Sequence, residues 1–208
     1  AAIRYRSLQQ FWRWCVEEGE VSDSPMAHMV APNVPEDPPA VLSDDDLRKL
    51  VKACEGRSFD ERRDLAIVRL LLDTGTRRGE LAGLSTNDID WDLNVFVVRG
   101  KDGWHRRCPF GRRAGQALDR YLRARSRHKH SDADALWLGR RGPMTDSGIS
   151  QILNDRARAA GLGRIHVHQF RHTFAHRWLS DGGNEGDLMM LAGWRSRSML
   201  QRYRASAA

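Results

Sequence analysis

Three residues of the sequence could act together on a phosphate group. They are Arg77 and Arg171, each in a short polar segment, and Tyr203, close to the last residue. An arginine guanidinium can hold two oxygens of one phosphate, and it keeps its proton near neutral pH. His168 precedes Arg171 by three residues, so on a helix both side chains would project from one face and could address one phosphate together. These residue types suit chemistry in which cations hold a phosphoryl group and a phenolate attacks it.

Removing the proton from Tyr203 is the difficult step in such chemistry, because a phenol has a reference pKa of about 10. We expect His168 to accept that proton. The leaving oxygen needs a proton in turn, which Lys101 could supply and an arginine could not. Trp194 would add a neutral indole N–H donor. Taken singly, each of these residues could equally serve as a cap, a core contact or a surface ion pair.

The chain has enough apolar sequence to bury a core around such residues, since it has 208 residues of which 40% are hydrophobic. Its apolar runs are shorter than the roughly 18 residues that a membrane span needs, and its first residues lack a secretory signal. We therefore expect a cytoplasmic protein without membrane contact. Cys15, Cys54 and Cys108 stand far apart without metal-ligand spacing, so the sequence predicts neither a disulfide framework nor a zinc site.

Positive charge, carried mostly by arginine, marks the sequence. The net charge is +7 and the isoelectric point is about 9.9, which favours a polyanionic partner such as nucleic acid. Only four of the 34 lysines and arginines are lysines. The arginine fork suits phosphate, although compositional drift would produce the same excess. Lys101 is the only lysine between Lys52 and Lys129, and this isolation supports its expected role as proton donor.

Prolines divide the sequence into two parts. Residues 3–19 predict a helix with an apolar stripe. Residues 31–40 carry four of the seven prolines and show no periodicity, which is typical of an extended linker. We expect a first part at 1–30, a proline-rich linker at 31–42 and the main domain at 43–208.

The main domain is expected to be α+β and mainly helical, with a small antiparallel sheet. Ser43 is a good N-cap ahead of a periodic apolar run, and an apolar helix over residues 65–72 would stop at Gly75. Further helices are expected near residues 78–84, 112–126, 145–160, 168–180, 184–192 and 196–203.

A β-hairpin is expected in the middle of this domain. The Val- and Phe-rich run at 91–99 predicts a strand, Gly100-Lys101-Asp102-Gly103 predicts a turn, and residues 104–110 predict the returning strand. Lys101 would therefore lie at or beside the tip of the hairpin.

In their order along the chain, these segments resemble the motifs of the tyrosine recombinase or phage integrase family. Residues 74–81 (TGTRRGEL) resemble its first arginine motif, and residues 100–103 resemble its hairpin lysine motif. Residues 168–172 (HQFRH) resemble its H-x-x-R-H box, and residues 191–194 (LAGW) with Tyr203 resemble its terminal motif. The resemblance covers almost the whole main domain, and the joint order is far more specific than any single motif.

The resemblance implies an enzyme that cleaves and rejoins DNA through a 3′-phosphotyrosyl bond, without metal, cofactor or ATP. Its implied catalytic residues are Arg77, Lys101, His168, Arg171, Trp194 and Tyr203. Glu80 would orient Arg77, unless the two form a plain surface ion pair. His172 would be either a phosphate-facing donor or a buried structural histidine.

The sequence departs from the family pattern at two positions. Trp194 stands where most members have histidine, although tryptophan also occurs there. Arg78 occupies a position that is usually apolar, so either Arg77 or Arg78 could face the phosphate, and the register of the motif favours Arg77. Tyr5 and Tyr121 compete with Tyr203 as nucleophile in principle, but neither follows a matching motif.

The implied partner is double-stranded DNA, held mainly by salt-dependent contacts to its phosphates. Some of the basic residues named for this role could instead be merely solvated. They are Arg78, Arg99, His105, Arg106, Arg107, Arg112, Arg113, Arg140, Arg141, Arg195 and Arg197.

The resemblance also sets expectations for the full-length protein. Residues 1–30 would be the end of a helical core-binding domain, and four copies would assemble on two DNA sites. The protein would be bacterial or phage-encoded and associated with the nucleoid. The alternatives are a type IB topoisomerase-like enzyme, which would relax supercoiled DNA without partner DNA, and an inactive DNA-binding relative, for which Tyr203→Phe would change nothing.

Overall fold

A computed structural model describes most of the chain, in two compact units, Ala1–Asp37 and Pro38–Ala208. The boundary lies inside the proline-rich segment that was expected to be a linker. No helix among the described residues is long and apolar enough to cross a membrane. The described residues are 2–32, 40–100, 103, 105–194, 196–197, 199–200 and 203.

The first unit contains helix α1 (Ala2–Glu17), which ends two residues before the expected boundary. Its apolar stripe is largely exposed, because Ile3 is 81% and Phe11 50% accessible. In the described part of this unit only Cys15 and Met26 are buried. Two buried side chains make a very small core, so the apolar stripe does not serve to pack this unit internally.

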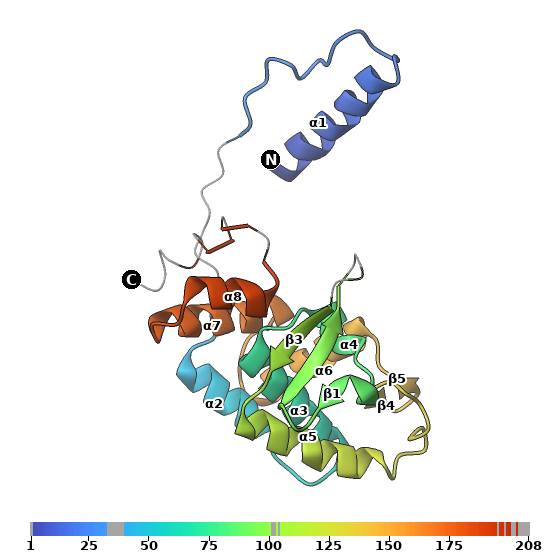
Figure 1. Cartoon of the computed structure of the whole chain (residues 1–208), viewed down its shortest axis with the longest axis vertical. Coiled ribbons are helices and arrows are strands. Elements are labelled where there is room, and N and C mark those ends of the chain that lie inside the picture. Colours follow the sequence, from blue (N-terminus) through green and yellow to red (C-terminus); the bar gives the residue numbers. More distant parts are fainter. Residues whose placement is uncertain are drawn as a thin grey trace. The chain divides into compact units, whose positions relative to one another are not determined.

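The second unit is mainly helical with small antiparallel sheets, as expected (Figure 1). Its helices are α2 (Asp44–Ala53), α3 (Phe59–Thr74), α4 (Arg78–Ala82), α5 (Arg112–Arg125), α6 (Asp146–Ala159), α7 (Val167–Ser180) and α8 (Glu185–Ala192), with a 3-10 turn at Thr86–Asp88. Its strands are β1 (Ile89–Asp90), β2 (Val95–Arg99), β3 (His105–Pro109), β4 (Leu138–Gly139) and β5 (Gly142–Pro143). Beyond α8, Met199, Leu200 and Tyr203 are also helical.

Helix α3 lies at the centre of this unit and packs against α5, α6 and α7. Its residues Ile67, Leu70 and Leu71 are fully buried. The helix begins at Phe59, earlier than the apolar run predicted, because Ser58 and Glu61 form a capping box that satisfies the first backbone N–H groups. This helix carries the segment that leads into the first arginine motif.

Strands β2 and β3 form the expected hairpin, with Arg99 opposite His105 and Val98 opposite Arg106. Strand β2 begins four residues later than expected, because the Asp90 carboxylate accepts hydrogen bonds from two following backbone N–H groups and forms a turn. Residues alternate between the two faces of the hairpin, so Arg106 lies on the inner face with buried Val98.

Tyr121 on α5 is a core residue with no exposed surface. Its hydroxyl donates to the Leu136 carbonyl at 2.9 Å and accepts from the Leu138 N–H at 3.0 Å. Burial raises the pKa of this hydroxyl to about 12. Tyr121 therefore holds the chain before β4 in place through its hydroxyl.

Candidate active site

The first arginine motif lies at the turn between α3 and α4. Arg77 precedes α4 as its N-cap residue, and its Nη1 donates to Glu80 Oε1 at 2.7 Å. Its Nη2 donates to the Gly193 carbonyl at 3.1 Å. Arg78 points elsewhere, since it pairs with Asp146 at the start of α6 at 2.7 Å. Arg77, which the register of the motif favoured, thus lies at the end of α8, and Arg78 lies at the start of α6.

Gly75 shapes this turn through its backbone. It ends α3 in the left-handed conformation, with φ at 56°, and its carbonyl accepts from Arg171 Nη1 at 2.8 Å. A β-carbon at this position would lie 2.6 Å from Cδ1 of Phe174. Only glycine combines the backbone conformation with the close approach to α7.

Gly75→Ala is expected to lower the free energy of unfolding by at least about 2 kcal/mol, from left-handed strain together with the clash against Phe174. Urea unfolding measures this change. Gly161→Ala is the matched control, because Gly161 also has a positive φ of 69° but nothing within 4 Å of an added β-carbon. Equal losses in the two variants would show that the approach of Phe174 contributes nothing.

Arg171 on α7 is buried, with 5% of its surface exposed. Besides the Gly75 carbonyl it donates to the Ala192 carbonyl through Nη2, and its guanidinium lies 5.3 Å from the centre of the Trp194 ring. Burial, and then the positive charges of Arg77 and Arg106, lower its pKa to about 10. The side chain stays positively charged at neutral pH, as phosphate binding requires.

The end of α8 is held by three arginines. The successive carbonyls of Leu191, Ala192 and Gly193 accept hydrogen bonds from Arg106, Arg171 and Arg77 respectively. The last carbonyls of a helix lack partners within the helix and carry partial negative charge, so cations stabilise them. We call Arg77, Arg106 and Arg171 the arginine cluster. Their guanidiniums contact the three residues that precede Trp194 in the chain.

Arg106 corrects an expectation. It was expected to contact DNA phosphates, yet its side chain is 8% exposed and its Nη2 lies 2.6 Å from Glu80 Oε2. The alternation of the strand turns it toward the core face. Its position opposite Val98 within an alternating apolar pattern was the sequence signal that would have revealed this placement.

Glu80 lies between Arg77 and Arg106, and its side chain is 9% exposed. This burial does not fit the alternative of a plain surface ion pair. Burial by itself would raise the pKa of the carboxyl, but the positive charges of Arg106 and Arg77 outweigh it and hold the pKa below its usual value. The carboxylate is therefore charged at neutral pH and orients both guanidiniums.

Glu80→Gln is expected to destabilise the protein by about 3 kcal/mol at pH 7, because it leaves Arg106 buried without its charge partner. The folded-state pKa of Glu80 lies below its unfolded value, so its stabilisation is present above the unfolded pKa and is lost as pH falls through the folded pKa. Urea unfolding from pH 7 to pH 3 should show the difference between the two proteins shrink. Asp45→Asn, which removes an exposed ion pair with Lys49, should change stability far less.

Trp194 and Tyr203 stack on one another, with ring centroids 5.2 Å apart. Both side chains are buried, at 7% and 1% exposure. The Tyr203 hydroxyl is hydrogen-bonded to Nδ1 of His172. Among the described residues Trp194 Nε1 is a buried polar atom without a hydrogen-bond partner. A buried N–H without an acceptor is costly, so this atom is suited to receive an oxygen from outside.

His168 lies one helical turn before His172 on α7, and its side chain is exposed. Its ring centroid is 6.0 Å from that of His172. Arg171 is buried, so the two members of the H-x-x-R pair differ in exposure although they were expected to act from one face. The histidine at the Tyr203 hydroxyl is thus His172, which the sequence left undecided between two roles.

The remaining site expectations divide into exposed residues and undescribed ones. Lys101 and Arg195 lie outside the described residues; the paired Arg99 and His105 bracket the loop that contains Lys101. The other expected DNA contacts are exposed, namely Arg78, Arg99, His105, Arg107, Arg112, Arg113, Arg140, Arg141 and Arg197.

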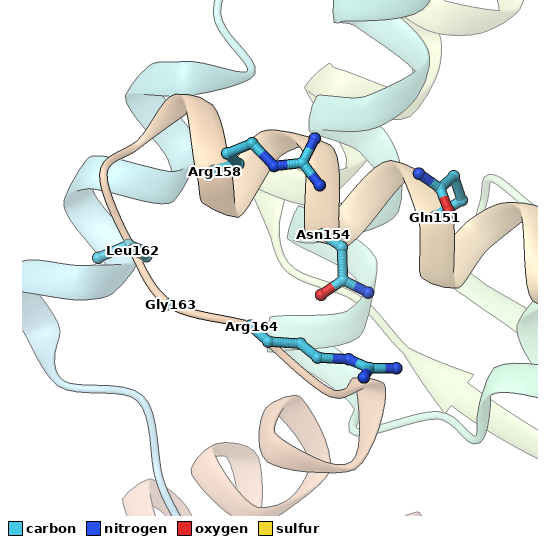
Figure 2. Close-up of a pocket in the computed structure, with 6 residues that line it drawn as sticks. All are labelled: Gln151, Asn154, Arg158, Leu162, Gly163 and Arg164. Atoms are coloured by element: carbon cyan, nitrogen blue, oxygen red, sulfur yellow. The ribbon is translucent and has the colours of Figure 1, made fainter.

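A separate pocket of about 390 Å³ lies beside the C-terminal half of α6. Figure 2 shows Arg158 and Arg164 with Asn154 and Gln151 on its walls. None of these residues belongs to the arginine cluster. Among the described residues no group of three or more His, Cys, Asp or Glu side chains could hold a metal ion.

Comparison with known proteins agrees with the motifs. The family model for the phage integrase family matches residues 40–208. A tyrosine recombinase XerC of Corynebacterium efficiens is 34% identical over 97% of this chain and 66% of its own length, so the chain spans about two thirds of that relative. The crystal structure of XerA recombinase matches with a TM-score of 0.72 at 31% identity, over 81% of this chain and 61% of that one.

A second solved structure shares the fold alone. The Tn1549 transposon integrase in complex with transposon right end DNA is 23% identical, with a TM-score of 0.77 over 95% of this chain and 72% of that one. The family model covers most of the chain, and its match includes all the motifs that carried the resemblance. This chain therefore belongs to the phage integrase family of tyrosine recombinases.

Proposed function

We propose that this chain is the DNA-cleaving part of a site-specific recombinase, which joins DNA to Tyr203 through a 3′-phosphotyrosyl bond. The observation that carries the proposal is the meeting of Arg77 and Arg171 at the end of α8, beside the buried, unpaired N–H of Trp194, with Tyr203 stacked on that indole. Two cations and a neutral donor beside one phenol suit a phosphodiester whose charge grows during attack. The tyrosine recombinase relatives support the same reaction.

In the proposed step the Tyr203 oxygen attacks phosphorus, the bond from phosphorus to the 5′-oxygen breaks, and the phosphate remains on the 3′ side. Arg77, Arg171 and Trp194 would hold the nonbridging oxygens. Lys101 is the proposed donor of the proton that the 5′-oxygen takes up. Since the new ester preserves the energy of the old one, a 5′-hydroxyl can reverse the step and reseal a strand without ATP or metal.

Tyr203 would have to leave its present packing before it attacks. Its side chain is 1% exposed and lies between the rings of Trp194 and His172. A phosphate that binds Arg77, Arg171 and the indole N–H of Trp194 would compete with the Tyr203 ring for the space beside the indole. DNA binding would thereby turn the phenol toward the phosphorus.

His172 is the proposed acceptor of the Tyr203 proton, in place of the expected His168. The hydrogen bond between His172 Nδ1 and the Tyr203 hydroxyl supports this role, while His168 contacts the ring of His172. His168 would then assist by supporting that ring, or by contacting the phosphate.

His172→Gln is expected to slow covalent attachment by roughly 10²-fold, because glutamine can hydrogen-bond the phenol but cannot take its proton. His168→Gln is the matched control and should slow attachment less. Single-turnover attachment rates of the parent and the two variants, measured at one pH, check this order. The reverse order of the two variants would assign the proton to His168.

The proposed partner is double-stranded DNA, which the exposed arginines of the hairpin and of α5 would hold through its phosphates. Assembly of four copies on two DNA sites, and action at the nucleoid, are proposed for the full-length protein. Residues 1–30 are proposed to be the end of its helical core-binding domain.

Covalent capture tests the proposed reaction without knowledge of the target site. The chain is incubated with duplex DNA of randomised sequence and denatured in SDS, and the attached DNA is recovered and sequenced. Mass spectrometry of the peptides should find a nucleotide 3′-phosphate on Tyr203. Recovery of no attached DNA, or attachment to another residue, would contradict the proposal. Relaxation of a supercoiled plasmid without strand exchange between two recovered sites would favour the topoisomerase-like alternative.

A further inference from the structure

Arg106 differs from Arg77 in its exposure, and from both other arginines of the cluster in the elements that it joins. Its side chain is 8% exposed, compared with 45% for Arg77. It reaches α8 at the Leu191 carbonyl and α4 at Glu80, and it comes from β3. It therefore joins three elements that carry or adjoin the site.

Both contacts of Arg106 bear on residues of the proposed mechanism. Glu80 presents Oε1 to Arg77 Nη1 at 2.7 Å, and its Oε2 accepts from Arg106 Nη2 at 2.6 Å and from the Arg77 backbone N–H at 3.1 Å, so the two guanidiniums flank one carboxylate. Arg106 is thus a second arginine side chain on this carboxylate, and it holds Oε2 from β3. Without Arg106, Oε2 would keep only the longer hydrogen bond from the Arg77 backbone N–H, so the carboxylate and the Arg77 guanidinium would be held less firmly.

The second contact fixes the start of the segment that carries Trp194. Gly193 ends α8 in the left-handed conformation, with φ at 64°. The backbone N–H of Trp194 then donates to the Met189 carbonyl at 2.9 Å and completes the cap of the helix. A β-carbon at Gly193 would lie 3.0 Å from Arg106 Nε. Arg106 thus packs directly against the turn that aims the indole.

We propose that Arg106 is a positioning residue: by holding Glu80 and the Leu191 carbonyl together, it keeps the Arg77 guanidinium and the Trp194 N–H aimed at one phosphate. The inference rests on the proposed function and deepens it. Burial keeps Arg106 in place whether or not DNA is bound, whereas Arg77 can exchange the Gly193 carbonyl for a phosphate oxygen. Arg106 would act through Arg77 and Trp194, without touching the DNA.

Arg107 offers a matched comparison. It follows Arg106 on β3 and lies on the opposite, exposed face. A residue that contacts a phosphate lowers the slope of log affinity against log salt by about one when it is removed. Arg107→Gln is expected to do so, whereas Arg106→Gln should leave both the affinity and the slope unchanged.

The test measures single-turnover attachment with the DNA recovered by covalent capture. At saturating DNA, Arg106→Gln is expected to slow attachment by roughly 10- to 100-fold, since small misplacements of catalytic groups have effects of this size. Trp194→Phe, which removes the N–H, should slow it as well. Because Arg106 acts partly through Trp194, the attachment rate of the double variant should fall by a factor much smaller than the product of the two single-variant factors. The same cycle with Arg107→Gln should give independent effects.

Three results would overturn the inference: a parental attachment rate in Arg106→Gln, independent effects in the cycle with Trp194→Phe, or a reduced salt slope. Should Arg106→Gln not fold, Arg106→Lys replaces it. Lysine keeps a cation beside Glu80, but its single ammonium cannot span both Glu80 and the Leu191 carbonyl, so the same pattern is expected. Failure of the proposed function looks different, because the parent chain itself would then attach no DNA.

Discussion

Replacing Tyr203 with phenylalanine is expected to abolish covalent attachment of DNA while leaving the protein folded. The variant loses one hydroxyl and its hydrogen bond to His172, which costs about 1 kcal/mol of stability. It keeps the ring that stacks on Trp194. No other atom of this side chain could form the ester, so SDS-resistant DNA should fall to the background of a reaction without protein. Thermal melting verifies that the fold persists.

The two other tyrosines are the controls for this experiment. Tyr5→Phe loses a hydrogen bond to the Met29 carbonyl in the first unit. Tyr121→Phe loses two hydrogen bonds in the core and should lower the melting temperature. Both should still attach DNA. Attachment that persists in Tyr203→Phe and disappears in either control would show that another tyrosine is the nucleophile. The proposed function would then lose its basis.

Arg171→Lys is expected to slow attachment by roughly 10³-fold at saturating DNA. The guanidinium binds the Gly75 and Ala192 carbonyls through separate nitrogens and still lies against the Trp194 ring. A lysine ammonium is a compact charge that cannot bond both carbonyls and a phosphate in this fixed geometry. Stability should fall by about 2 kcal/mol, since two buried carbonyls lose their partner.

Arg125 provides a matched control, because it is also a buried arginine that donates to backbone carbonyls. It is 6% exposed, and it donates to backbone carbonyls that include Leu136 at 3.1 Å and Ala135 at 2.7 Å. Arg125→Lys should therefore lose comparable stability without a specific effect on chemistry. If both variants slow attachment equally once stability is matched, Arg171 acts only as a structural support.

Much of the fold follows from local sequence signals. The capping boxes at Ser43 and Ser58, and the stop at Gly75, depend on residues only a few positions apart. Boundaries were less predictable where a side chain competed for the backbone, as Asp90 does in the turn that delays β2. The order of the motifs also revealed the family, because a spacing pattern remains readable without any contact between its members.

The partners of each site residue could not be read from the chain, because they come from distant segments. Arg106 lies 85 residues from the carbonyl that it binds and 26 from Glu80, and its role follows from which face of β3 meets the core. Tyr203 contacts His172 in preference to His168 because the turn of α7 and the packing of Trp194 select one ring. Residue types and spacing thus determined the chemistry that we propose for this chain. Long-range packing decided which residues contact one another, since hydrogen bonds and buried charges are satisfied only by groups that the fold brings within reach.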